Sequence, residues 1–291
     1  MLAGLTGKHI ARRAGSGAAQ RSARKRNRDM QSPKDQADGL RRIFKGSRMK
    51  LVPVVSNPHV PEAGVLVEAL CAAFAEQGLH TLVVDAAESA PAANELASVD
   101  LGASIERLSR EVSYLAARGL PMRHLNTQGS AAGFLDALAE AAPQAEVLVL
   151  HASAAELARL IGQRELRPVL IAGLEPQSVT HAYAGMKWLS QRCGIMAYSL
   201  LLAAHPQLNL AGRIAQRISS CGDSFLGALL RDWACFDPKT PLGAPLPTEL
   251  RHLARELLNI TPHSSGIAAG ESGAPLRPLA PARYAFLAGA I

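Results

Sequence analysis

The fold is decided by residues 49–85, which read MKLVPVVSNPHVPEAGVLVEALCAAFAEQGLHTLVVD. Residues 51–55 are a short apolar run of the kind that forms a buried parallel strand, and residues 81–85 are a second such run. Between them, residues 65–77 carry apolar side chains at helical spacing. The stretch therefore predicts a strand, a turn, a helix and a second strand, the arrangement that opens a nucleotide-binding α/β domain.

The predicted turn, residues 56–64, does not have the composition of a phosphate-binding loop. Such a loop needs glycines that let backbone N–H groups point inward, a lysine for the phosphate oxygens and a hydroxyl for magnesium. Here Pro58 and Pro61 remove two N–H donors, the carboxylate of Glu62 would repel phosphate, and residues 51–186 contain no lysine. The position of the turn suits a nucleotide, whereas its chemistry opposes one.

Strand-like and helix-like segments alternate along most of the chain. Strands are expected at residues 51–55, 81–85, 147–151, 169–172 and 196–203, and helices at residues 65–77, 105–117, 131–141, 154–161, 178–191 and 211–220. This alternation predicts an α/β fold with a doubly wound, mainly parallel sheet. In such sheets ligands bind beyond the carboxyl ends of the strands, which here are residues 56–64, 85–93 and 151–155.

The charge of the chain is concentrated at its start. Residues 1–30 contain eight Lys or Arg and one acidic residue, which leaves residues 31–291 with 23 of each sign. The main part of the chain therefore has no net field to attract nucleic acid or membrane. We expect residues 1–30 to be a disordered basic extension, with three interpretations open: a solvated tail or a start at Met30, a phosphate- or lipid-binding segment, or a transit peptide.

Composition also divides the rest of the chain, residues 31–291, into segments. Residues 31–47 are expected to form an N-terminal helix and residues 48–240 the α/β domain, followed by a proline-rich linker, a short helix and a tail over residues 241–291. Leu250, Leu253, Leu257 and Leu258 form one apolar stripe of that short helix.

Cysteines and histidines give no metal-binding pattern. Cys71, Cys193, Cys221 and Cys235 lack C-x-x-C spacing, and the nine histidines lack the H-x-x-x-H spacing of metal sites. The cysteines are expected to be free thiols of a cytoplasmic protein. No run of 18 uninterrupted apolar residues is present, so no membrane-spanning helix is expected.

Two segments resemble a known family. Residues 35–44, DQADGLRRIF, resemble the D-Q-A-x-G-L-R segment at the front of the FlhG/FleN flagellar regulators, which are relatives of the MinD and ParA ATPases. Residues 176–187, PQSVTHAYAGMK, resemble the P-x-S-x-x-D-A-Y-A-x-x-K stretch of that family. The resemblance covers roughly residues 35–238, and it implies a P-loop NTPase-like fold of the MinD/ParA type.

The family's phosphate loop, K-G-G-x-G-K-[ST], aligns with residues 58–64 of this chain. Pro58 replaces the signature lysine, Ala63 replaces the loop lysine, and Gly64 stands in place of the hydroxyl that binds magnesium. Asp85 matches the carboxylate that ends the second strand in the family, but Ala87 stands where a second aspartate is usual.

A further aspartate of the family, in a D-x-x-x-G setting, is His151 here. The combined losses imply a degenerate ATPase that is no enzyme and has no catalytic residue, cofactor or metal. The vestigial nucleotide site then consists of Ser56, Pro58, Glu62, Ala63, Gly64, Asp85 and His151.

The resemblance also implies a partner. In the family, the N-terminal helix binds FlhF, the signal-recognition-particle-like GTPase of polar flagellation, and stimulates its GTP hydrolysis. Leu40 and Phe44 would be apolar anchors, while Gln36, Arg41 and Arg42 would orient groups near the partner's phosphates. The implied partner-binding residues are Asp35, Gln36, Gly39, Leu40, Arg41, Arg42 and Phe44.

The implied role is control of flagellar number or placement in the cytoplasm. Basal-body or transcription-regulatory proteins are further implied partners, through which the protein would take a polar or membrane-peripheral position. No specific nucleic-acid binding and at most weak membrane association are expected.

Three other readings are open. The chain could be an active MinD/ParA-type ATPase that uses ATP and magnesium as a membrane or positioning switch, or a ParA-like nucleic-acid binder with a local basic patch. Asp85 and His151 could also form a new acid–base pair, because both are expected at strand ends that face one crevice. Ser56 and Ser153 lack the context of a nucleophile elbow, which disfavours hydrolase chemistry.

Overall fold

The computed structural model describes residues 49–162, 164–241 and 243–259. In this part of the chain, eight strands form one sheet in the order β3-β4-β2-β5-β1-β6-β7-β8. Every neighbouring pair is parallel except β3 and β4, which are antiparallel. The strands are β1 (Lys50–Val55), β2 (Thr81–Asp85), β3 (Glu106–Arg107), β4 (Val112–Ala116), β5 (Val147–Ala152), β6 (Val169–Ala172), β7 (Ala197–Ala203) and β8 (Leu229–Phe236).

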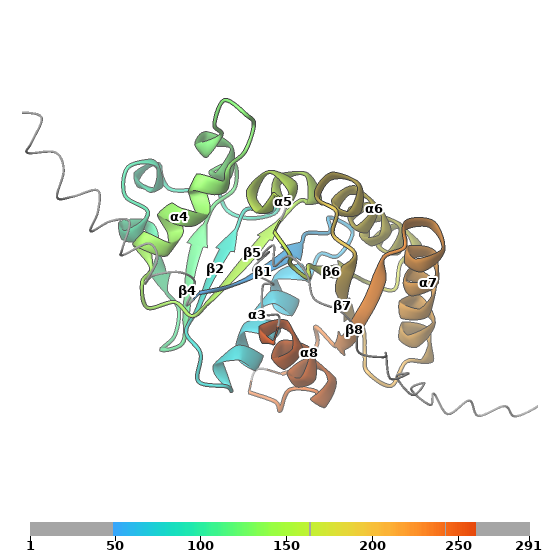
Figure 1. The fold of residues 1–291 in the computed structure, drawn as a ribbon. Helices are drawn as coiled ribbons and strands as arrows, with labels where there is room; N and C mark the ends of the chain where they lie inside the picture. The colour runs from blue at the N-terminus through green and yellow to red at the C-terminus, as the bar shows by residue number, and fades with distance from the viewer. Residues whose placement is uncertain (1–48, 163, 242, 260–291) are drawn as a thin grey trace, which may run out of the picture. The chain divides into compact units, whose positions relative to one another are not determined.

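Helices cover both faces of the sheet (Figure 1). One face carries α4 (Ala132–Ala141), α5 (Ala154–Ile161), α6 (Pro176–Cys193) and α7 (Asn209–Leu226). The other face carries α3 (Ala63–Ala75) and α8 (Thr248–Leu258). Three short 3-10 turns complete the described part: η1 (Glu95–Ser98), η2 (Gly102–Ser104) and η3 (Pro121–His124).

The central strand β5 shows why this architecture forms. Leu148 and Leu150 pack into the core below α4 and α5, whereas Val147 and Val149 pack into the core below α3. All six residues of β5 are buried, as expected for a parallel strand with helices on both faces. The prediction of a doubly wound, mainly parallel sheet is confirmed.

The expected helix over residues 105–117 is wrong. This segment forms the short strand β3, a turn and the parallel strand β4, which pairs with β2 along its whole length. Ile105, Leu108, Val112 and Leu115 imitate helical spacing, but Leu108 is exposed to solvent. Residues 112–116 form a strand because β-branched and aromatic residues such as Val112 and Tyr114 pack well on a pleated sheet beside β2.

Two elements after residue 226 complete the core. The edge strand β8 pairs in parallel with β7 and has no counterpart among the expected strands. The short helix α8 buries Leu250, Leu253 and Leu257 in the core that α3 also covers. Arg251 of α8 donates two hydrogen bonds to the carboxylate of Glu76, at 2.7 and 3.2 Å, and so ties α8 to the end of α3. None of the helices in the described ranges is both long enough and apolar enough to cross a bilayer.

Candidate functional site

The loop between β1 and α3 follows the carboxyl end of β1, where ligands bind in doubly wound folds, and its own residues accept hydrogen bonds from three of its backbone N–H groups. The N–H of His59 donates to the side-chain oxygen of Asn57 at 3.1 Å, and the N–H of Val60 donates to the Asn57 carbonyl at 3.0 Å. The N–H of Ala63 donates to the Val60 carbonyl at 3.1 Å. Since Pro58 and Pro61 have no N–H, the loop does not present the inward row of donors that a phosphate requires.

Asn57 fixes this loop from inside. The residue is 3% exposed, and its Nδ2 donates to the carbonyls of Ile171 and Ser178, each at 2.8 Å. The β1–β6 ladder ends at the pair Val55–Leu170, so the bond to Ile171 continues the pairing one step further with a side chain. Asn57 was not among the residues that the sequence singled out, because a polar residue after a strand shows no sign of being buried.

Ser178 belongs to the same group of hydrogen bonds, on the side of the β6–α6 connection. Its hydroxyl donates to the Glu175 carbonyl at 2.7 Å and accepts from the Gly173 N–H at 3.0 Å. The residue is fully buried. The P-x-S part of the segment that resembles the flagellar regulators therefore has a structural use here, which is to hold the start of α6 against the β1–α3 loop.

The residues of the vestigial loop lie next to Asn57 in sequence. Ser56 continues β1 and donates its N–H to the Ala152 carbonyl at 2.8 Å, while Pro58 is exposed. Glu62 is the N-cap residue of α3 and is exposed, so its negative charge lies near the positive end of the helix dipole, where a phosphate would otherwise bind.

The two other positions of the vestigial loop open α3. Ala63, its first residue, is buried, whereas Gly64 is exposed. A Cβ on Gly64 would meet no atom of the described residues within 4 Å, so none of them approaches closely enough to require a glycine there.

Asp85 and His151 end neighbouring strands and contact each other. The strands place them in direct register, and His151 Nδ1 lies 2.9 Å from Asp85 Oδ1. Asp85 Oδ1 also accepts from the Ala87 N–H at 3.2 Å, and the Tyr114 hydroxyl lies 3.5 Å from Asp85 Oδ2. Burial, followed by the charge of Asp85, raises the pKa of Tyr114 to about 12. Both carboxylate oxygens of Asp85 thus lie beside protein groups.

The histidine of this pair is buried. His151 is 2% exposed, and its Nε2 is buried without a hydrogen-bond partner in the described part of the chain. A general base must come within hydrogen-bond reach of its substrate, which a buried nitrogen cannot do without a rearrangement. No group of three or more His, Cys, Asp or Glu residues that could hold a metal ion is found among the described residues.

Two further histidines, His59 of the β1–α3 loop and His181 of α6, contact each other. The rings of His59 and His181 are in edge contact, with centroids 5.6 Å apart. Burial and the neighbouring His59 lower the pKa of His181, while a hydrogen bond to the Ser56 backbone and the charge of Glu88 act in the opposite direction. The ring contact thus joins the β1–α3 loop to α6.

Ser153 caps a helix. Its hydroxyl accepts from the Glu156 N–H at 3.3 Å and donates to the Glu156 carboxylate at 3.1 Å, a side-chain cap at the N-terminus of α5. The expected partner-binding residues Asp35, Gln36, Gly39, Leu40, Arg41, Arg42 and Phe44 lie outside the described residues.

Comparisons with known proteins agree on the fold. No family model matches the chain, and no curated protein matches it. The structure of the MinC:MinD cell division protein complex from Aquifex aeolicus matches with a TM-score of 0.50 at 10% identity, over 73% of this chain and 96% of that chain. The Cyanothece McdA(D38A)–ATP complex matches with a TM-score of 0.51 at 12% identity, over 74% of this chain and 98% of that chain. At these identities the likeness concerns the fold alone, which is the MinD/ParA type of P-loop NTPase fold.

Proposed function

We propose that this chain, built on the MinD/ParA-type fold, is a non-catalytic adaptor that acts through protein contacts and not through a nucleotide cycle. The observation that carries the proposal is the loop between β1 and α3. The N–H groups of His59, Val60 and Ala63 donate to Asn57 and Val60, and the Asn57 side chain is itself bonded to two carbonyls. A nucleotide would have to compete with all of these bonds without gaining a lysine contact.

The state of the carboxylates supports the same proposal. Phosphoryl transfer depends on positioned charges: a lysine, a magnesium ion and a group that orients the attacking water. Here the lysine positions hold Pro58 and Ala63, and Asp85 is bonded to His151. Several losses at one site are better explained by a protein that no longer uses nucleotide than by a poor ATPase.

The finer proposal is control of flagellar number or placement. It rests on the resemblance of residues 35–44 to the front segment of the FlhG/FleN regulators. The proposed partner is FlhF, and the proposed action is stimulation of its GTP hydrolysis by Gln36, Arg41 and Arg42, with Leu40 as an apolar anchor. That proteins of this fold can bind a partner protein is illustrated by the MinC:MinD complex.

Phosphate release from the GTP-loaded partner tests this function. The full chain is expected to raise the turnover of the partner GTPase, Leu40→Ala to weaken binding, and Arg41→Ala to lower the stimulated turnover at saturation. A matched control is Arg217→Ala, which removes the same charge from an exposed position of α7. If the Leu40 and Arg41 variants stimulate as well as wild type, or if the full chain has no effect on the partner, the adaptor mechanism is wrong.

A further inference from the structure

An open groove of about 380 Å³ lies between the η1–η2 segment and the last turn of α4. Its lining combines the apolar residues Ala97 and Ala141 with the exposed acidic residues Asp100 and Glu140. A Cβ on Gly102 would lie 3.8 Å from the Ala141 carbonyl oxygen, so η2 packs directly against the end of α4. The groove is therefore formed by two segments that are fixed against each other.

Two large apolar side chains are exposed at this groove. Val99, which lines it, is 90% exposed, and Leu96 is 58% exposed. The Val99 N–H donates to the Leu96 carbonyl at 2.9 Å, and side chains three positions apart on a 3-10 turn lie one above the other. Val99 is the most exposed large apolar residue in the part of the chain that the structure describes. Apolar side chains placed together on a surface favour contact with another segment.

The charges at the groove favour a basic occupant. Asp136 lies one turn before Glu140 on α4, and neither carboxylate has an ion-pair partner among the described residues. Two basic residues lie close by, and both have contacts of their own. Arg123 donates to the serine of η1, and the ring of His124 lies 5.0 Å from that of Phe134. The unpaired charges on α4 are therefore negative.

The segment that precedes β1 carries the opposite charge. Residues 49–259 contain 16 Lys or Arg and 20 Asp or Glu, whereas residues 1–48 contain 13 Lys or Arg and three Asp. Within that basic segment, residues 41–48 read RRIFKGSR, in which Ile43 and Phe44 are flanked by basic residues on both sides. An apolar pair between cations matches a groove with an apolar wall and free carboxylates.

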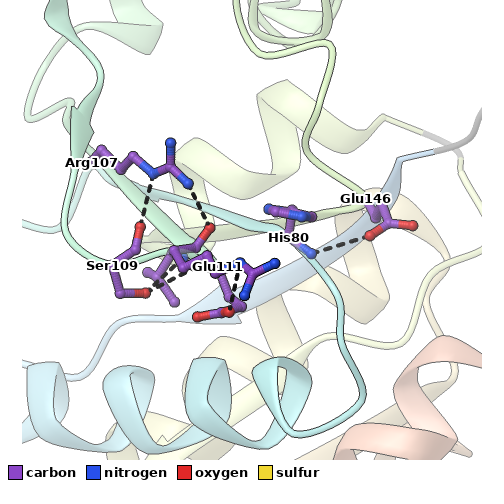
Figure 2. A network of polar contacts seen from close by, with 7 residues as sticks. His80, Arg107, Ser109, Glu111 and Glu146 are labelled. Carbon is purple, nitrogen blue, oxygen red and sulfur yellow. Dashed lines mark hydrogen bonds and ion pairs between the residues drawn. The ribbon is translucent and has the colours of Figure 1, made fainter.

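The chain also enters the domain close to this groove. The Lys50 N–H donates to the Glu146 carbonyl at 2.7 Å, and the Glu146 carboxylate accepts from the His80 N–H at 3.2 Å (Figure 2). Only five residues of chain lead from Ala141, in the groove, to Glu146, so the two lie at most about 18 Å apart. Residues 43–44 precede Lys50 by six or seven residues, which can span about 20 Å when extended. The apolar pair can therefore reach the groove.

We propose that residues 41–48 dock in this groove of the same chain. The side chains of Ile43 and Phe44 would cover Val99, and the flanking basic residues would face the carboxylates of the groove. Because the segment is tethered, its effective concentration at the groove is about millimolar, so weak contacts suffice. Docking would also withhold Arg41 and Phe44 from the partner GTPase. That consequence rests on the proposed function, whereas the docking does not.

A fluorescein-labelled peptide with the sequence of residues 38–48, DGLRRIFKGSR, tests whether the groove is filled by the chain itself. The full chain with Ile43→Ser and Phe44→Ser should bind the peptide saturably in a fluorescence anisotropy titration, because its own segment has lost both apolar anchors. The wild-type full chain should bind the peptide about tenfold more weakly or less, because its tethered segment competes for the groove.

Changes in the groove locate the docking, and each is added to the full chain with Ile43→Ser and Phe44→Ser. Val99→Ser should weaken peptide binding about fivefold by removing apolar contact, and Glu140→Gln about threefold by removing one charge. Both residues are exposed, so neither change should disturb the fold. Glu68→Gln is the matched control, because it removes an exposed carboxylate from α3, which does not line the groove, and it should leave the affinity unchanged.

Four results would overturn the proposal. They are no saturable binding of the peptide to the chain with Ile43→Ser and Phe44→Ser, equal affinity of that chain and wild type, unchanged affinity after Val99→Ser, and equal effects of Glu140→Gln and Glu68→Gln.

Discussion

The replacement Asn57→Ala tests whether the hydrogen bonds of the Asn57 side chain hold the β1–α3 loop in its conformation. The variant loses two donated bonds of 2.8 Å and one accepted bond of 3.1 Å, all made by the side chain of a residue that is 3% exposed. Each such bond contributes about 0.5–1.5 kcal/mol to stability, so the loss is expected to be about 3 kcal/mol. For a domain of this size that corresponds to a fall in Tm of roughly 6–12 °C.

Urea unfolding followed by circular dichroism measures this loss directly. Asn94→Ala is the control, because Asn94 accepts a single bond of 3.1 Å, from the Leu96 N–H at an exposed turn, and should cost about 1 kcal/mol or less. Asn57→Asp keeps the acceptor for His59 and loses both donors, so it should be at least as destabilised as Asn57→Ala. If Asn57→Ala loses no more stability than Asn94→Ala, the loop is not held by the Asn57 side chain, and this part of the account is wrong.

Three further outcomes follow from the site. A double-mutant cycle of Asp85→Ala and His151→Ala should give a coupling free energy of about 1 kcal/mol or more, since the two side chains share a 2.9 Å contact; additive effects would contradict a structural pair. Because the pKa of Tyr114 is raised to about 12 in the folded protein, its contribution to stability is complete below pH 10 and is lost as pH rises through 12. In Tyr114→Phe, the alkaline fall in the free energy of unfolding should therefore be less steep than in wild type, and an unchanged slope would refute the assignment. Without a nucleotide to bridge two subunits, the mass measured by light scattering after size exclusion should be the same with and without MgATP, and an ATP-dependent dimer would argue for a switch.

Local sequence predicted most of the sheet. The strands Thr81–Asp85 and Val169–Ala172 were predicted to the residue, since each is a short apolar run between turns. The edge strand β8 was missed because Arg231 and Asp232 interrupt its apolar pattern beside a register shift, and its pairing with β7 is not visible in local sequence. A parallel strand is defined by a distant partner, so spacing alone could not separate β4 from a helix.

The site was predictable in position but not in geometry. The carboxyl ends of β1, β2 and β5 were expected to meet, and the structure places Asp85 beside His151. Their contact depends on the register between two strands that are separated by more than 60 residues, which composition does not give. The burial of Asn57 likewise depends on the β6–α6 connection, which is distant in sequence. The residues next to Asn57 in sequence therefore do not indicate that it is buried.

The central claim is that the chain does not use a nucleotide, and calorimetric titration of the full chain with ATP and magnesium tests it most directly. Losing the lysine contacts of a phosphate loop removes about 1.5–3 kcal/mol for each charge-assisted bond, and the loop offers no replacement. We therefore predict no saturable heat from ATP, with or without magnesium. A saturable, magnesium-dependent titration with a micromolar Kd would contradict the account and favour an active ATPase.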